Sequence, residues 1–215
     1  MAQSIQDRLL AAQIAIENAL NDEEIAPLLT AYGYDVTKLN VGNALRQAAM
    51  QEVQRQVEEY GDQFTATDMV NQAWQQANAE YMKHVKIARV AFKNERGAFQ
   101  KLALDGQRKR TLSGWLGQAR QFYSNALSDT HVQNVLLGFG IDVAALTAAQ
   151  ALVDAAEQAS AAQESEKGDA QQATLERNKA MQALDAWMSD FIAIARIALA
   201  GKPQLLEKLG VQVKN

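Results

Sequence analysis

Two histidines are the side chains best suited to acid–base or metal chemistry in this chain of 215 residues. His84 follows Glu80 by four positions, which places both on one face of a helix. A carboxylate-bridged di-iron bundle needs Glu-x-x-His, so the spacing is wrong for that site. A chain with 2 His and no Cys also offers few zinc ligands. We interpret His84 as a histidine at the edge of the core, and we expect no metal site and no cofactor.

The second histidine, His131, stands close to Ser128 and Asp129. Three residues within one turn cannot form a catalytic triad, because triad partners converge from separate segments. Ser128 and Asp129 instead predict a helix N-cap, where a short polar side chain accepts hydrogen bonds from free backbone N–H groups. The Gly-Phe-Gly segment at 138–140 has neither the third glycine nor the preceding strand of a dinucleotide loop, and it is typical of a helix end. We therefore predict that the protein is not an enzyme.

Arg89 and Arg196 occupy equivalent places in two similar apolar segments, 87–92 and 194–199. Helical spacing puts each guanidinium at the edge of the core, where it needs carboxylate or backbone partners. We predict that each arginine forms a structural ion pair that ties a long helix to a loop. An anion-binding role is the alternative.

A basic region extends from residue 83 to residue 120, with 10 Lys and Arg against 2 acidic residues. Cations on helices can follow a phosphate backbone and give salt-sensitive binding. Helix C-termini also attract Lys and Arg through the helix dipole, and the formal net charge of -4 argues against a wholly nucleic-acid-binding surface. Nucleic acid is therefore the alternative partner, with an anion site at Lys101, Arg108, Lys109 and Arg110.

The elements that carry these residues repeat along the chain at a constant offset of 107 positions. Gly33 corresponds to Gly140 and Arg89 to Arg196, and no gap is needed between residues 9 and 104. A repeat of this length is the size of a domain rather than of a solenoid unit. We predict a tandem duplication with copy one at 1–107 and copy two at 108–215, packed together as one compact or elongated body.

The composition predicts an all-α fold. Ala and Gln are abundant and only 2 Pro are present, and both features favour helix. Each copy is predicted to be a helical-bundle unit with a short helix pair, a long antiparallel helical hairpin and a short terminal helix. The Gly-Asp pairs at 61–62 and 168–169 are predicted to break the long helix of each copy and so form the hairpin.

The two predicted hairpin tips differ in polarity. The copy-one tip carries Val53, Val57, Tyr60 and Phe64, whereas residues 158–172 of copy two are mostly polar. Exposed apolar clusters tend to mark interfaces, so we predict that the copy-one tip binds a protein partner or a second protomer. The leading functional hypothesis is a non-enzymatic helical interaction or scaffold protein.

Two further features bear on location and ligands. Residues 1–7 lack the basic and apolar segments of a secretory signal, and the nearly apolar run 191–200 is too short to span a bilayer. We expect a cytoplasmic protein without a membrane span. The aromatic residues at helical spacing, among them Trp74, Trp115 and Trp187, are predicted to form core, with a small apolar ligand between helices as the alternative.

Overall fold

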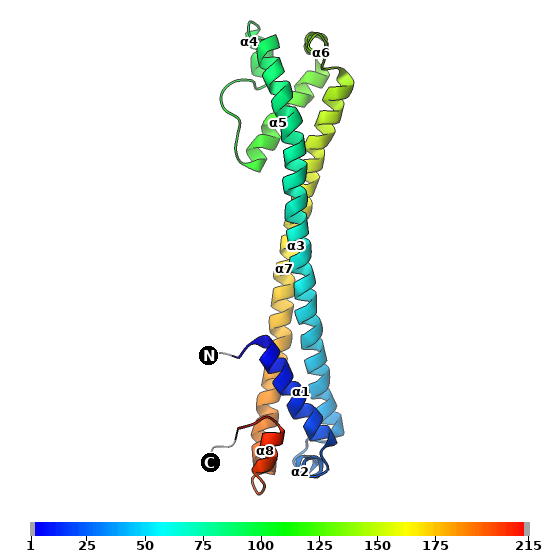
Figure 1. The fold of residues 1–215 in the computed structure, drawn as a ribbon, viewed down its shortest axis with the longest axis vertical. Helices are drawn as coiled ribbons and strands as arrows, with labels where there is room; N and C mark the ends of the chain where they lie inside the picture. Colours follow the sequence, from blue (N-terminus) through cyan, green and yellow to red (C-terminus); the bar gives the residue numbers. More distant parts are fainter. Residues whose placement is uncertain (1–2, 213–215) are drawn as a thin grey trace. The chain divides into compact units, whose positions relative to one another are not determined.

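The computed structural model describes residues 3–212, and every element within them is an α-helix (Figure 1). This confirms the all-α prediction. The eight helices of the described range are α1 (Ile5–Asn21), α2 (Ile25–Thr30), α3 (Val36–Ala91), α4 (Arg96–Lys101), α5 (Leu112–Ser128), α6 (Thr130–Leu137), α7 (Val143–Ala198) and α8 (Gln204–Lys208). The bounds of α5 and α7 lie 107 positions after those of α1 and α3.

Short polar side chains cap the beginning of α1 and of α6, and the cap of α6 at Asp129 is the one that the sequence predicts. Ser4 and Asp7 form a capping box at the start of α1, each side chain accepting from the other's backbone N–H. The Asp129 carboxylate accepts from the backbone N–H of His131 and of Val132 at the start of α6. Each of these contacts satisfies backbone donors that have no partner within the helix.

Glycine in the left-handed conformation separates the short helices from the long ones. Gly33 has φ +82° and Gly140 has φ +80°, a region that residues with a Cβ rarely adopt. Two residues after Gly33, Asp35 accepts from the N–H of Lys38 in α3, and Asp142 plays the same part in α7. The helix end predicted at residues 138–140 is therefore confirmed, and Gly33 ends the equivalent helix of unit 1.

The predicted break at Gly61 and Gly168 is wrong, and so is the hairpin within each copy. α3 and α7 each continue through 56 residues without a turn. A glycine inside a helix costs only about 1 kcal/mol relative to alanine, and packing along the rest of the helix outweighs that cost. The antiparallel partner of each α3 segment is a segment of α7, and not a second helix of the same copy.

The chain divides into two compact units, and both contain segments of α3 and α7. Unit 1 consists of Met1–Gly61 and Gly168–Asn215, and unit 2 of Asp62–Lys167. Unit 1 therefore combines α1 and α2 with α8, and unit 2 combines α4 with α5 and α6. Each unit takes residues from both sides of residue 107, where the sequence predicts the boundary between the copies.

In unit 1, α1, α2 and α8 lie against the segments of α3 and α7 (Figure 1). The two long segments are antiparallel, because Gly42 of α3 meets Trp187 of α7, and Arg55 meets Glu176. The Trp187 ring stacks on Phe191 at 5.2 Å between centroids. Aromatic and aliphatic side chains fill this end of the unit.

Unit 2 has an aromatic core around Tyr81, which is fully buried. The Tyr81 ring lies 6.0 Å from Trp115, 5.9 Å from Phe122 and 6.2 Å from Tyr123, all three on α5. Aromatic pairs at such separations stabilise a core beyond the area that they bury. This cluster fixes α5 on α3.

Candidate functional site

The buried polar pair of unit 2 has a structural role. His84 is 2% exposed, and its Nδ1 lies 3.2 Å from the hydroxyl oxygen of Tyr123. Burial lowers the pKa of His84 and raises that of Tyr123. A neutral imidazole that shares a hydrogen bond with a neutral phenol is a packing pair, and it lies deeper in the core than the sequence predicts for His84.

His131 lies at the surface and forms an ion pair with Glu95. The distance from His131 Nε2 to Glu95 Oε2 is 2.8 Å, and the hydrogen bond with this carboxylate raises the pKa of His131. Asp129 caps α6 and also binds Lys101 at 2.8 Å. The contacts of His131 and Asp129 are therefore surface and capping contacts.

The two arginines for which the sequence predicts ion pairs differ from each other. Arg89 donates from Nε to the carbonyl of Leu104 at 2.9 Å and from Nη2 to that of Gly106 at 2.8 Å. Arg89 ties α3 to a loop, with carbonyls rather than carboxylates as partners. Arg196 is exposed, and within residues 3–212 its side chain has no hydrogen bond or ion pair.

Four apolar residues of α3 form a line along unit 1, which we call the α3 stripe: Met50, Val53, Val57 and Tyr60. They recur at spacings of three and four, the pattern of a coiled-coil seam. Met50 is 46% exposed, Val57 68% and Tyr60 41%, and Val53 is half-buried. Three of the predicted partner-binding residues thus share one face of α3, which Met50 extends. The fourth, Phe64, is 68% exposed and belongs to unit 2.

Helix α1 covers one end of the α3 stripe and leaves the other end open. Val53 packs in a cluster with Ile5 and Leu9 of α1. Val57 lies one turn further along α3, and it is exposed because α1 begins at Ile5 and does not extend over it. An open groove of about 310 Å³ runs between the two helices, lined by Gln6, Leu9, Leu10, Gln13, Arg46 and Met50.

Polar contacts with α7 hold the open end of the stripe in place. Gln56 donates from Nε2 to the Thr174 hydroxyl at 3.1 Å and accepts from Arg177 Nη1 at 2.8 Å. The Tyr60 hydroxyl lies 3.5 Å from the same Thr174 oxygen. These bonds join Gln56 and Tyr60 of α3 to α7 beside the open end of the stripe.

The positions of unit 2 that correspond to the stripe are all polar. At the offset of 107 they are Glu157, Ser160, Glu164 and Lys167 on α7. Lys167 Nζ lies 2.7 Å from Glu164 Oε1, and Glu157 forms an ion pair with Arg120. Unit 2 thus closes with ion pairs the face that unit 1 leaves apolar.

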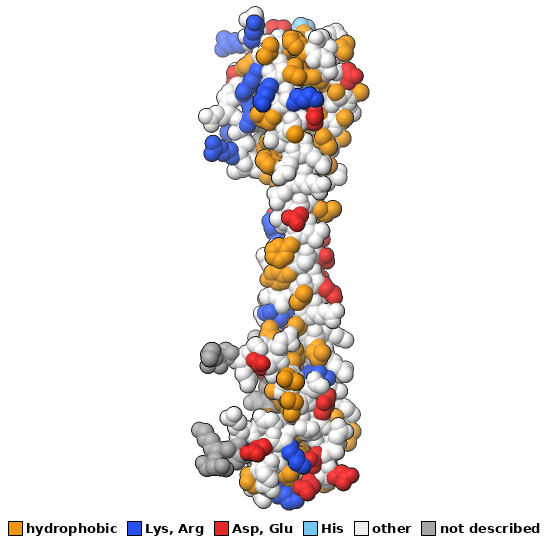
Figure 2. Space-filling model, viewed as in Figure 1, with side chains coloured by type: hydrophobic (Ala, Val, Ile, Leu, Met, Phe, Trp, Pro, Cys, Tyr) orange, Lys and Arg blue, Asp and Glu red, His pale blue; other side chains and the backbone are white. Residues whose placement is uncertain are grey.

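The predicted anion site of four cations is not a single cluster. Two of its members already have partners. Lys101 binds Asp129, and Arg108 donates to the Tyr81 hydroxyl at 2.9 Å and to the Asp105 carbonyl at 2.7 Å. The cations of the basic region that are exposed and have no ion pair in the described structure are Lys86, Lys93, Arg96, Lys109 and Arg110. Blue side chains gather over this part of unit 2 in Figure 2.

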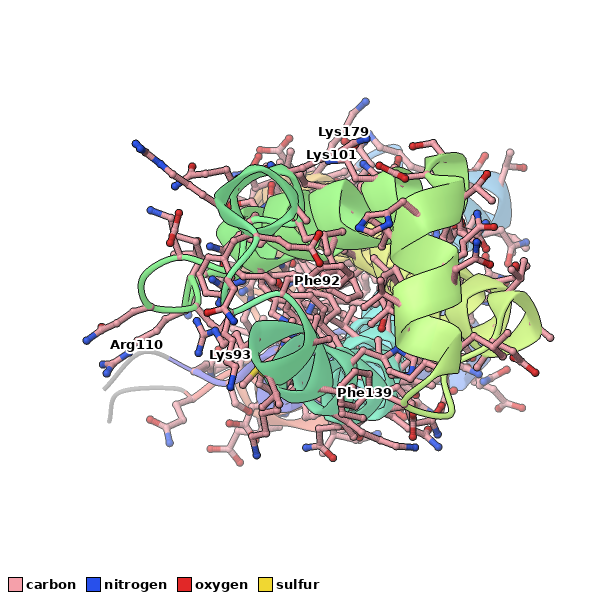
Figure 3. The ribbon with its side chains drawn as sticks, turned by 90° about the horizontal axis from the view of Figure 1, so that it is seen from above. Phe92, Lys93, Lys101, Arg110, Phe139 and Lys179 are labelled. Atoms are coloured by element: carbon pink, nitrogen blue, oxygen red, sulfur yellow. The ribbon has the colours of Figure 1, made fainter. Side chains whose placement is uncertain are left out.

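The view down onto unit 2 separates these groups further. Lys93 and Arg110 lie toward the same side of the view, and Lys101 lies toward another side (Figure 3). The free cations at 93 and 110 therefore share a face that Lys101 does not. The sequence predicts the basic region but not this division, which depends on where each side chain finds a carboxylate.

A small hollow lies beside Arg110, and the sequence does not predict it. It has a volume of about 210 Å³ and is lined by Val70, Asn71, Trp74, Arg110 and Leu112. Trp74 is half-buried rather than fully part of the core, and its ring lies 6.3 Å from that of Trp115. The hollow is smaller than the roughly 300–1,000 Å³ typical of drug-sized ligands.

Comparisons with known proteins find no relative of this chain. No protein-family model, no curated protein and no solved structure matches the chain. Among residues 3–212, none of the helices combines the length and the apolar character needed to cross a lipid bilayer.

Proposed function

We propose that the protein is a non-enzymatic helical interaction protein that binds a second copy of itself through the α3 stripe. The observation that carries this proposal is the contrast between two equivalent faces. Val57 and Tyr60 are exposed in unit 1, whereas the equivalent Glu164 and Lys167 form an ion pair in unit 2. If this face only had to be solvated, polar residues would serve equally well in unit 1 and in unit 2. Exposed apolar side chains in a line are typical of an interface.

The occupant of the stripe is an α-helix, because the chain already covers part of this face with one. α1 buries Leu9, Ala12, Ala15, Ile16 and Ala19, a face built on helical spacings of three and four residues. The α3 stripe has the same spacing. A stripe from a second copy therefore carries the pattern that α1 uses in unit 1, and two stripes pack with each other about a two-fold axis.

The energy available to this contact is modest. Complete burial of a Val-sized or Leu-sized side chain stabilises by roughly 1.5–3 kcal/mol. Val57 is 68% exposed and Tyr60 41%, so these residues of two chains gain only part of that amount each, and association itself costs at least roughly 4 kcal/mol. We therefore expect a dimer that dissociates on dilution rather than an obligate one.

Sedimentation velocity over a dilution series tests the proposal. The wild-type chain is expected to approach twice its mass of 23.6 kDa as concentration rises. The variant Val57→Glu with Tyr60→Lys carries the residues found at the equivalent positions of copy two, and it is expected to stay monomeric with an unchanged midpoint of thermal unfolding. Because both positions are exposed, the variant should fold.

A second variant keeps the result decisive if that one unfolds. Val57→Gln changes only the most exposed member of the stripe and should weaken the dimer at least several-fold. A wild-type chain that remains monomeric at every concentration up to its solubility limit would overturn the proposal. So would a dimer of unchanged affinity in both variants, because association would then use another surface.

We further propose that the chain arose by tandem duplication of a segment corresponding to 1–107, with 108–215 as the second copy. The matching helix bounds of α1 with α5 and of α3 with α7 support this. On this view the apolar stripe and its polar equivalent diverged from one ancestral face. The polar face of unit 2 is then the natural comparison for the apolar face of unit 1.

A further inference from the structure

The second surface of interest lies in unit 2, along the loop between α4 and α5. This loop runs beside α3, to which it is joined by hydrogen bonds at two places, and a third place is a shared hollow. Arg89 binds the carbonyl of Leu104, Arg108 binds the Tyr81 hydroxyl, and Arg110 borders the hollow that contains Trp74. From residue 89 to residue 74 the helix rises roughly 22 Å at 1.5 Å per residue. The loop therefore follows about four turns of α3, and its own cations, Arg108, Lys109 and Arg110, are consecutive residues near Tyr81 and Trp74.

This path is bounded by cations that form no ion pair within residues 3–212, and Asp105 lines a second hollow together with Lys93 and Arg96. Lys109 and Arg110 stand at the lower end of the path, and Lys93 and Arg96 follow the end of α3 at its upper end. Lys93 and Arg110 lie toward one side of unit 2 in Figure 3. An extended polyanion that lies along this side would meet positive charge over several of its repeating units.

The overall acidity of the chain does not oppose this surface locally. Unit 2 contains 11 Lys and Arg and 11 Asp and Glu, whereas unit 1 contains 10 and 14. The net charge of -4 therefore comes from unit 1. Within unit 2 most acidic side chains lie outside the segment 83–120, which holds only 2 of them.

The hollow at Trp74 adds a feature that a plain cationic surface lacks. An indole ring that is half-buried, beside an unpaired guanidinium and the Asn71 side chain, can stack a flat ring and donate hydrogen bonds to its edge. Proteins that bind single-stranded nucleic acid combine such aromatic platforms with a basic groove that follows the phosphates. The volume of about 210 Å³ suits one base and not a whole nucleotide cofactor.

Unit 1 has no counterpart of this arrangement within the described residues, although its helices match those of unit 2. At the offset of 107, Trp74 corresponds to Met181, which is 3% exposed and belongs to the core. Lys93 corresponds to Ala200, and Arg96 to Pro203. The cations and the ring are thus not needed to build this fold.

We propose that unit 2 binds single-stranded nucleic acid along the loop 104–110. The phosphates contact Lys93, Arg96, Lys109 and Arg110, and one base stacks on Trp74 in the hollow. This surface shares no residue with the α3 stripe, so the proposal does not depend on self-association. Binding is expected to be tolerant of sequence, because every base has a flat face to stack.

Fluorescence anisotropy with a short fluorescein-labelled oligothymidylate, titrated at several salt concentrations, tests the proposal on the full chain. Affinity is expected to fall steeply with salt. Arg110→Gln should weaken binding and reduce the salt slope by about one, as expected for one phosphate contact. Lys179→Gln removes one exposed cation from unit 1 and serves as the control, with no expected change.

Trp74→Leu separates base stacking from general attraction to anions. Loss of the ring should weaken oligothymidylate binding by roughly tenfold or more, and it should leave the weaker binding of inorganic polyphosphate unchanged. If Trp74→Leu unfolds, quenching of wild-type tryptophan fluorescence by oligothymidylate but not by polyphosphate gives the same answer. Absence of binding at low salt would overturn the proposal. Equal binding of both anions, with no effect of Trp74→Leu and no selective quenching, would also overturn it.

Discussion

Lys167 Nζ lies 2.7 Å from Glu164 Oε1, at two positions of α7 that correspond to Tyr60 and Val57 of α3. Both side chains are well exposed, so the pair contributes little to stability. The pair instead determines the polarity of the surface, because the two charged side chains keep this face of unit 2 solvated. The same fold therefore carries one polar and one apolar version of the same face.

Transfer of the apolar residues to unit 2 should create a second surface for self-association. The variant Glu164→Val with Lys167→Tyr is expected to form species larger than a dimer, since each chain then has two faces that pair with themselves. Light scattering coupled to size-exclusion chromatography measures the mass. Glu164→Gln with Lys167→Gln removes the ion pair without adding apolar surface and should behave like the wild type. A mass unchanged in the apolar variant would count against the pairing of these faces.

Replacement of Gly168 by alanine should stabilise the protein. Gly168 lies inside α7 with a negative φ, and a Cβ added to it would meet no atom within 4 Å. Alanine also reduces the conformational freedom of the unfolded chain, so the free energy of unfolding should rise by roughly 0.5–1 kcal/mol. Chemical denaturation measures it. Gly33→Ala is the opposite control, because φ +82° strains alanine, and this variant should lose stability. A destabilised Gly168→Ala would show that α7 is not a regular helix at this point.

Gly42→Ala should destabilise unit 1, in contrast to Gly168→Ala. A Cβ at Gly42 would fall on the indole of Trp187, which is itself confined by Phe191 and by Tyr34 at 5.9 Å. Overpacking of this kind costs roughly 1–3 kcal/mol. Differential scanning calorimetry should show a lower unfolding temperature.

Replacement of the indole provides the control for this contact. Trp187→Phe shortens the ring that meets Gly42. Gly42→Ala should therefore cost less stability in the Trp187→Phe background than in the wild type. If the costs of the two substitutions simply add, the two residues are not in contact as described.

The local signals of the sequence are sufficient to predict how most helices begin and end. Ser4, Asp129 and Gly33 act within one turn of the chain, so their roles follow from residue type and position alone. The break predicted at Gly168 fails for the opposite reason. Whether a glycine ends a helix or lies within it depends on the packing of neighbouring turns against another segment, and that segment is distant in the sequence.

The candidate surfaces show the same limit. The apolar character of Val57 and Tyr60 is evident from the sequence, but the reason for their exposure is the position at which α1 begins relative to α3. Helical spacing places Arg89 at the core edge, yet its partners are carbonyls of a loop that has no periodic pattern. The hollow at Trp74 depends on where the same loop returns to α3.

His84 should make the stability of the protein depend on pH below neutrality. Burial lowers its pKa, so the folded state binds a proton less readily than the unfolded chain, whose histidine titrates near 6.5. The unfolded state then holds more protons as pH falls through this value. The free energy of unfolding should therefore be constant above about pH 7 and decrease below about pH 6.5, by at most roughly 1.4 kcal/mol per pH unit for this group.

Urea denaturation between pH 5 and pH 8, in wild type and in His84→Phe with Tyr123→Ile, measures this contribution. The double variant installs the residue types of Phe191 and Ile16, the equivalent and fully buried residues of unit 1, and it should show a shallower dependence. His131→Gln is the control of opposite sign. Glu95 raises the pKa of His131, so its contribution is present at low pH and is lost as pH rises. Removal of His131 should make the dependence slightly steeper, and equal slopes in all three proteins would show that His84 is not buried in its neutral form.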